Sequence, residues 1–151
     1  MAVLRWKSFL MLDILFQRYK SNRQIYAPFY QSELFDIRLK PLNLLQVGVE
    51  SSIPVWHKFL QRSNIYCIDE FDKREPKKYD YLNLPRVMWS RCDTSNEKSI
   101  NNIMKNVWNK PRFDIIIDST NNFAYSRKTF LKRFSIGKYY IEDGDEVRIV
   151  K

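Results

Sequence analysis

Short stretches of apolar, β-branched and aromatic residues recur along the chain after Pro41. Their first residues are 21 to 26 positions apart, which is the length that a short strand, a helix and two short loops require. Within each stretch the apolar residues are continuous rather than alternating, as in strands that helices cover on both faces. The pattern therefore predicts a mostly parallel, five-stranded sheet, with strands at 44–49, 65–68, 87–90, 113–117 and 138–141.

The segments between these strands carry helix signals. Two serines at 51 and 52, followed by Pro54, are typical of a helix N-terminus. The segment 95–108 has apolar residues at helical spacing, and Ser95 is its expected cap. A third helix is expected to end before Gly137, whereas the polar, proline-flanked segment 73–85 is expected to be a loop.

The chain length and composition indicate one folded domain. A chain of 151 residues with 44% hydrophobic residues is too short for two large cores and too apolar for disorder. We expect residues 1–40 to form a helical segment that packs on or extends the core, and residues 41–151 to form a Rossmann-like domain.

The apolar run 3–16 is interrupted by charged residues, and no small-residue cleavage site follows it. It is therefore expected to be neither a membrane span nor a signal peptide. We interpret it as a helix over about 4–18 that serves packing or homo-oligomer formation, with an interfacial membrane helix as the alternative.

The net charge of +9 would attract anions, yet no block of about five or six like charges occurs. We interpret the charge as a well-solvated surface. Nucleic-acid binding is the alternative, in which Trp89, Arg91, Tyr79 and Tyr81 would stack on bases. The three aromatic side chains are more often found in core or loop packing.

The two cysteines, Cys67 and Cys92, lie in separate apolar stretches without neighbouring histidines. We expect buried thiols rather than a disulfide or a metal site, and hence a reducing, cytoplasmic location.

Acidic residues follow the ends of four successive predicted strands. Asp69, Asp93 and Asp118 follow the second to fourth strands, and Glu142 and Asp143 follow the fifth. Because the carboxyl ends of parallel strands meet at one edge of a sheet, these side chains are expected to converge there. Carboxylates at that edge suit ribose hydroxyls, an adenine amino group or a hard cation such as magnesium.

Two simpler interpretations of these residues stay open. Aspartate is a common first residue of loops and helix caps. The dipeptide Asp143-Gly144 is also typical of a hairpin turn, with 146–150 as a short returning strand.

Several catalytic motifs are absent. With glycines only at 48, 137 and 144, the chain contains no G-x-G-x-x-G, and it has neither a P-loop nor a serine elbow. Gly48 still permits one close approach of the backbone to a ligand. The one histidine, His57, is expected to pack or face solvent rather than to act as a base.

The ordered series of motifs resembles the class I S-adenosylmethionine-dependent methyltransferases, and within them the macrocin-type O-methyltransferase and cephalosporin hydroxylase-like branch. The motifs are LLQVGV at 44–49, Trp56, IYCID at 65–69, Asp93, FDIIID at 113–118 and YIED at 140–143. The resemblance implies a Rossmann-like α/β methyltransferase fold with a leading helical segment.

The resemblance also implies roles for single residues. Gly48 would approach the methionine part of S-adenosylmethionine, Asp69 would hold its ribose, and Asp93 would lie near its adenine. The remaining cofactor-binding residues that it implies are Glu50, Ser51 and Asp118. Glu142 and Asp143 match the acidic pair that binds magnesium in that branch.

Some positions depart from the family pattern. Gln46 replaces an acidic residue, Ser119 replaces a second metal-binding aspartate, and Asn122 stands where the family has a histidine base. Both later changes remove chemistry, because serine is a poor magnesium ligand and asparagine cannot accept a proton. The family also adds two strands and a helix after the fifth strand, so we expect the sheet to lack these final strands.

The resulting functional hypothesis is O-methyl transfer from S-adenosylmethionine to a small-molecule or sugar acceptor. The alternative is a binding or scaffold domain that keeps the methyltransferase fold without turnover.

Overall fold

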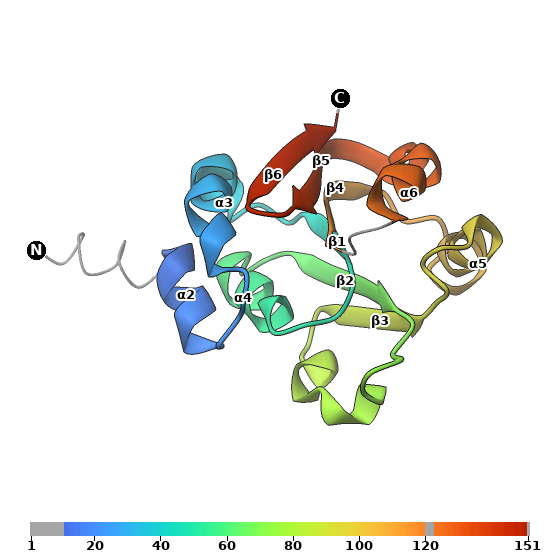
Figure 1. Ribbon diagram of the computed structural model, residues 1–151, viewed down its shortest axis with the longest axis horizontal. Coiled ribbons are helices and arrows are strands. Elements are labelled where there is room, and N and C mark those ends of the chain that lie inside the picture. Colours follow the sequence, from blue (N-terminus) through green and yellow to red (C-terminus); the bar gives the residue numbers. More distant parts are fainter. Residues whose placement is uncertain (1–10, 120–122, 151) are drawn as a thin grey trace, which may run out of the picture.

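The computed structural model describes residues 11–119 and 123–150, and these form a sheet between two layers of helices (Figure 1). The six strands lie in the order β3-β2-β1-β4-β5-β6. Strands β1 to β5 run parallel, and β6 is antiparallel to β5. The strands are β1 (Asn43–Val47), β2 (Asn64–Asp69), β3 (Val87–Arg91), β4 (Phe113–Asp118), β5 (Ser135–Asp143) and β6 (Glu146–Val150).

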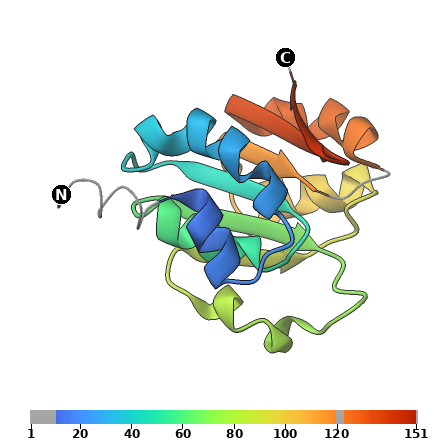
Figure 2. The same ribbon diagram turned by 60° about the vertical axis from the view of Figure 1, so that its left-hand side comes forward.

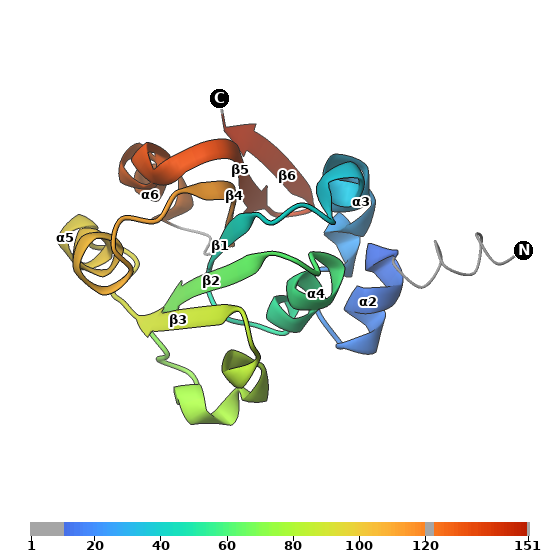
Figure 3. The same ribbon diagram turned by 180° about the vertical axis from the view of Figure 1, so that it is seen from behind.

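Helices cover both faces of this sheet. One layer contains α2 (Leu12–Arg18), α3 (Ala27–Leu34) and α4 (Ser52–Phe59), which lie in front of the strands in Figure 2. The other contains α5 (Glu97–Asn102), its π-helical continuation η5 (Ile103–Val107) and α6 (Ala124–Leu131), as the view from behind shows (Figure 3). The 3-10 turns that lie wholly within the described ranges include η1 (Gln24–Tyr26), η2 (Phe35–Ile37), η3 (Pro76–Lys78), η4 (Asp80–Asn83) and η7 (Lys132–Phe134).

Alternate residues of each strand feed two separate hydrophobic clusters. In β1, Leu44 joins α2, α3 and α4 on one face, whereas Leu45 joins α5 and α6 on the other. Both side chains are fully buried. This two-sided burial explains why the strands are continuously apolar in sequence.

The five predicted strands and their parallel arrangement are confirmed, and a sixth strand corrects the strand number. Gly144 takes a φ of +63° in the two-residue connection from β5 to β6. The hairpin interpretation of Asp143-Gly144 is therefore confirmed. This two-residue turn lets the chain reverse, so that β6 pairs with the edge of β5 that β4 leaves free.

Two local predictions were wrong. The cap of α5 is Asn96, whose side chain accepts a hydrogen bond from the Ser99 amide at 3.1 Å. Ser95 instead donates its hydroxyl to Asp93 at 2.6 Å, one residue before the cap. The polar segment 73–85 also contains η3 and η4 rather than loop alone.

The leading segment packs directly on the α/β core. Phe16 of α2 and Tyr30 of α3 each make edge-to-face ring contacts with Trp56 of α4. Of the helix expected over about 4–18, the first residues lie outside the described part of the chain. The division into 1–40 and 41–151 stays a prediction. Over the described ranges, no helix combines the length and apolarity that crossing a membrane requires.

Gly137 marks a close approach between β5 and β4. A Cβ atom at this position would lie 2.3 Å from the Asp114 carbonyl oxygen, and the pairing of the two strands shifts register here. Glycine is thus the residue that lets the strands meet at this irregularity.

A buried ion pair joins α6 to the end of β4. Arg127 is 1% exposed, and its Nε lies 2.7 Å from the Asp118 carboxylate, which is fully buried. A second guanidinium nitrogen donates to the Thr94 carbonyl at 2.7 Å, in the loop after β3. One side chain therefore connects three neighbouring segments at the carboxyl edge of the sheet.

We predict that Arg127→Met lowers the free energy of unfolding by about 3–5 kcal/mol, because it leaves the Asp118 carboxylate buried without its cation. Arg133→Met is the matched control. Its exposed ion pair with Glu97 should contribute at most about 1 kcal/mol. Urea unfolding monitored by circular dichroism measures both free energies. Equal losses for the two variants would contradict a special role for the buried ion pair.

Candidate functional site

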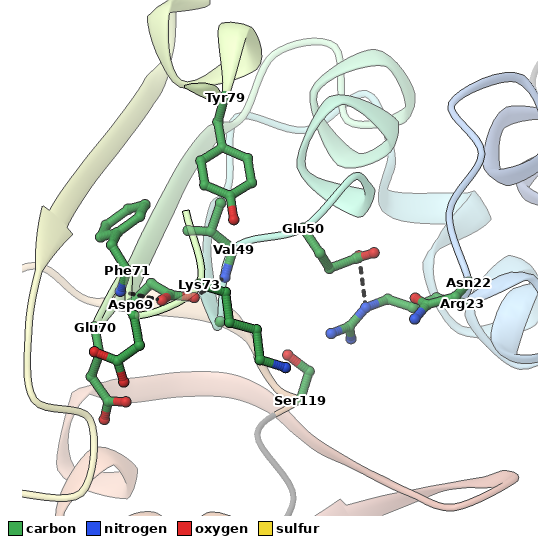
Figure 4. Close-up of a pocket in the computed structure, with 12 residues that line it drawn as sticks. Asn22, Arg23, Val49, Glu50, Asp69, Glu70, Phe71, Lys73, Tyr79 and Ser119 are labelled. Atoms are coloured by element: carbon green, nitrogen blue, oxygen red, sulfur yellow. Dashed lines mark hydrogen bonds and ion pairs between the residues drawn. The ribbon is translucent and has the colours of Figure 1, made fainter. Parts of the chain in front are cut away.

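A cavity of about 350 Å³ lies at the carboxyl edge of the sheet, beyond β1, β2 and β4 (Figure 4). Here the strand order reverses, since β1 has β2 on one side and β4 on the other. Open parallel sheets bind ligands at such a reversal. The described residues that line the cavity are Asn22, Arg23, Gly48, Val49, Glu50, Asp69, Glu70, Phe71, Asp72, Lys73, Tyr79 and Ser119.

The turn after β1 is organised by a buried glutamine. Gln46 donates its amide to the Gly48 carbonyl at 2.7 Å. Its side-chain oxygen accepts from the Ser52 hydroxyl at 2.7 Å and from Trp56 Nε1 at 2.8 Å. Gly48 itself has a φ of +94°, in the region that glycine tolerates best. A glutamate at 46 could not donate to the carbonyl when ionised, which explains the amide here.

Asp69 joins the loops that follow β1 and β2. Its carboxylate accepts from the Val49 amide at 2.6 Å and from the Phe71 amide at 2.6 Å. Phe71 has a φ of +57°, which is costly for a bulky residue and persists only when its surroundings enforce it. A carboxylate has about four acceptor sites, so two loop amides leave acceptor capacity for a ligand.

Arg23 connects two carboxylates on the opposite side of the cavity. Its Nε lies 2.7 Å from Glu50 Oε1, as the dashed line in Figure 4 shows. A terminal nitrogen of the same guanidinium is ion-paired with Glu142 of β5. Glu142 also accepts from the Tyr30 hydroxyl at 2.8 Å. Burial raises the pKa of Tyr30, so this hydroxyl stays protonated and acts as a donor.

The cavity is acidic although the protein is basic. Among its described lining residues, Glu50, Asp69, Glu70 and Asp72 oppose two cations, Arg23 and Lys73. The Lys73 ammonium group points toward Ser119 across the cavity (Figure 4). This excess of carboxylates, in a chain of net charge +9, favours ligands that carry positive charge.

The structure brings three of the sequence-predicted cofactor residues, Gly48, Glu50 and Asp69, to this cavity. Asp93 lines an adjoining cavity with Glu70 and Asp72. The Ser95 hydroxyl donates a hydrogen bond to the Asp93 carboxylate, and this bond holds the pKa of Asp93 below its usual value.

The other two predicted cofactor residues lie elsewhere. Ser51 donates to the Lys20 carbonyl at 3.4 Å and does not line the cavity. Asp118 is fully buried under the strand ends, in its ion pair with Arg127.

The residues expected to hold magnesium do not fit that ion. Glu142 is engaged by Arg23 and Tyr30, whereas Asp143 is exposed and accepts from Tyr125 at 2.9 Å. Successive strand residues point to opposite faces, so the two carboxylates diverge. Within the described ranges, no three His, Cys, Asp or Glu side chains are grouped to bind a metal.

Ser119 and Asn122 occupy the altered catalytic positions. The Ser119 hydroxyl donates to the Val47 carbonyl at 2.5 Å, so it ties the end of β4 to β1. Asn122, at the position of the family base, lies outside the described residues.

Sequence reasoning missed Arg23, Lys73 and Tyr79 as lining residues. Arg23 lies in the short loop between α2 and η1, and no local motif marks it. Its position against Glu50 and Glu142 depends on how the leading segment packs. Lys73 and Tyr79 lie in the segment that follows β2. Because this segment follows a strand end at the reversal of strand order, its residues could have been predicted to line the site.

The four side chains considered for nucleic-acid binding lie around the loop after β2 and the edge strand β3. Tyr79 and Tyr81 pack against the core, and Trp89 packs edge-to-face on Phe71 at a centroid distance of 5.4 Å. Arg91 donates to the Glu70 carbonyl at 2.8 Å. Packing thus accounts for Tyr79 and Tyr81, whereas Trp89 and Arg91 stay partly exposed at the surface.

The free thiols of Cys67 and Cys92 are both buried, as predicted. Burial raises the pKa of both thiols.

Two crystal structures of the MycE methyltransferase from the mycinamycin biosynthetic pathway resemble this fold. The complex with Mg and SAH (S-adenosylhomocysteine) is 25% identical, with a TM-score of 0.71, over 88% of this chain and 34% of that one. The complex that also holds mycinamycin VI is 23% identical, with a TM-score of 0.74, over 87% and 38%. This chain therefore spans only about a third of the length of MycE.

The chain has the fold of the class I S-adenosylmethionine-dependent methyltransferases. The resemblance to that superfamily and to its macrocin-type branch is thus confirmed. The plantazolicin methyltransferase BpumL, solved with SAH, shares the fold at 16% identity and a TM-score of 0.52, over 91% of this chain and 60% of that one. No protein-family model matches the sequence, and no curated protein matches it either.

We predict that Gln46→Met lowers the free energy of unfolding by about 3 kcal/mol, because Gly48, Ser52 and Trp56 then keep buried polar groups without partners. Gln61→Met, at an exposed position, is the matched control. Denaturant unfolding monitored by tryptophan fluorescence gives both values. A loss below about 0.5 kcal/mol at position 46 would refute the organising role of this amide.

His57, in the helix α4 that follows β1, should make the stability of the protein depend on pH. Burial and the neighbouring Arg86 lower its pKa, and its Nε2 lies 2.8 Å from the Pro85 carbonyl. Since the unfolded chain then binds the proton more readily, stability should fall as pH decreases below about 6.5. Urea unfolding between pH 7.5 and 5.5 should show a smaller decrease for His57→Gln than for the wild type. Identical decreases for the two proteins would show that His57 does not contribute to the loss of stability.

Proposed function

We propose that this protein binds S-adenosylmethionine in the cavity beyond β1 and β2 and transfers its methyl group to a hydroxyl of a small molecule or sugar. The observation that carries the proposal is Asp69. This carboxylate is fixed by two loop amides at the end of β2, beside the turn at Gly48. An acidic residue in this place is suited to accept both hydroxyls of a ribose.

The charges of the cavity select among ribose-containing ligands. A nucleotide with several phosphates would meet four carboxylates and two cations. S-adenosylmethionine carries a sulfonium, an ammonium and one carboxylate group, so its net positive charge suits a cavity with an excess of carboxylates. Its adenine would extend toward the adjoining cavity that Asp93 lines.

The structural relatives support the same ligand class. MycE and BpumL were each solved with SAH, and one MycE complex also holds mycinamycin VI. Those ligands belong to proteins that are longer than this chain. For the present protein they make a small-molecule acceptor the first class to test.

The acceptor site that we propose is a smaller cavity next to the first. Its described lining residues include Asn22, Arg23, Tyr26, Ser119 and Glu142, three of which also line the larger cavity. When bound, S-adenosylmethionine would supply a methyl group activated by the sulfonium charge; SAH would be the leaving group, and the hydroxyl proton of the acceptor would pass to water. The residues of the chain contribute alignment of donor and acceptor, which alone accounts for a large share of such a rate enhancement.

Other sequence predictions remain proposals. These are a cytoplasmic location and self-association through the N-terminal helix. Nucleic-acid binding has no support from the placement of the four aromatic and basic side chains.

Calorimetric titration with S-adenosylmethionine and SAH tests the proposal. We expect a dissociation constant in the micromolar range, or about −8 kcal/mol. Asp69→Asn should weaken binding by at least about tenfold, because the amide nitrogen cannot accept from ribose and opposes a loop amide.

Asp36→Asn is the matched control, since Asp36 is exposed and precedes β1 at the opposite edge of the sheet. It should bind like the wild type. If the wild type binds neither compound, or if both variants bind equally well, the proposed ligand is wrong. Incubation with labelled S-adenosylmethionine and sugar acceptors then tests turnover separately.

A further inference from the structure

We infer that the guanidinium of Arg23 is a built-in cation that replaces a divalent metal at this site. The inference concerns the cavity of the proposed function and deepens it, but its test does not require S-adenosylmethionine. The carboxylates of this site fit magnesium poorly.

The geometry places one cation between two carboxylates from distant parts of the chain. Glu50 follows β1 and Glu142 belongs to β5, and both are ion-paired with the Arg23 guanidinium. The Glu142 side chain is 3% exposed, and that of Arg23 is 11% exposed. A carboxylate buried to this degree needs a cation or strong donors beside it.

Additional hydrogen bonds hold this arrangement. Ser21 donates its hydroxyl to Glu50 Oε2 at 3.3 Å and accepts from the Arg23 backbone amide at 3.2 Å. The Ser52 amide donates to Glu50 Oε1 at 2.8 Å. Tyr30 donates to the other oxygen of Glu142. The carboxylates are therefore fixed before any ligand arrives.

The same contacts make a metal unnecessary and unfavourable. Magnesium requires about six oxygen ligands at close range, and a guanidinium between the carboxylates both fills that space and repels the ion. Asp143, the neighbouring acid, points away toward Tyr125 and Arg148. Ser119, where the family has an aspartate, donates to Val47 and adds no charge.

A cation attached to the chain has a functional consequence. It supplies positive charge next to the cavity that Tyr26, Ser119 and Glu142 line, at every metal concentration. Methyl transfer at this site would then be insensitive to chelators. The leading segment, which carries Arg23, becomes part of the binding site rather than packing alone.

Manganese binding to the ligand-free, full-length protein tests the inference. Mn²⁺ serves as the probe, because the electron paramagnetic resonance signal of the free ion reports the bound fraction. Wild type and Arg23→Lys should show no site tied to Glu142. Arg23→Met and Arg23→Gln should bind at least about tenfold more tightly, because the carboxylate pair is then left without its cation.

Two further variants make the result specific. Adding Glu142→Gln to Arg23→Met should remove the gained binding. Arg148→Ala, which removes an exposed cation close to Asp143, should leave Mn²⁺ binding at the wild-type level. Circular dichroism establishes that each variant is folded.

Two results would overturn the inference. One is Mn²⁺ binding by the wild type that Glu142→Gln abolishes, a comparison that holds even if the Arg23 variants do not fold. The other is that folded Arg23→Met and Arg23→Gln gain no binding. Failure of the wild type to bind S-adenosylmethionine would refute the proposed function and leave the manganese result interpretable.

Discussion

The double hydrogen bond from loop amides to Asp69 is the constraint on which the binding edge depends. Val49 belongs to the turn after β1, and Phe71 belongs to the loop after β2. One carboxylate therefore joins two loops, together with the backbone hydrogen bond from the Gly48 amide to the Ile68 carbonyl at 2.8 Å, and it holds Phe71 in a strained backbone conformation. The cavity wall exists in a defined shape because this acceptor is shared.

The two sides of the cavity differ in how far their carboxylates are offset by cations. At the β2 side, Asp69, Glu70 and Asp72 outnumber the one cation among the described lining residues, Lys73. At the β5 side, the single positive charge of Arg23 offsets one of the two negative charges of Glu50 and Glu142. The negative charge is therefore larger at the β2 side, where the ribose and adenine would lie, than at the β5 side.

The strands were predictable because their signal is local. Each is a short apolar run, and the spacing of the runs leaves room for one helix between neighbours. Gly48 and Asp69 could be placed in the site by the same logic, since parallel strands end at one edge. The sequence did not decide whether a sixth strand exists, because Asp143-Gly144 suits both a hairpin turn and a ligand site.

The remaining parts depend on tertiary packing, which a single sequence does not display. Arg23 reaches Glu142 only because Phe16 and Tyr30 dock their helices on Trp56. The alternation of side chains along β5 separates Glu142 from Asp143, although the two are adjacent in sequence. Asp118 follows a strand end like Asp69, yet a buried Arg127 from α6 takes its carboxylate.

A crystal structure of the protein grown with SAH and Mn²⁺ tests the central claim most directly. The account predicts ribose hydroxyls on Asp69 beside Gly48, with the Arg23 guanidinium between Glu50 and Glu142 and no anomalous manganese peak there. SAH bound away from Asp69, or a manganese ion between the two glutamates with Arg23 displaced, would contradict it.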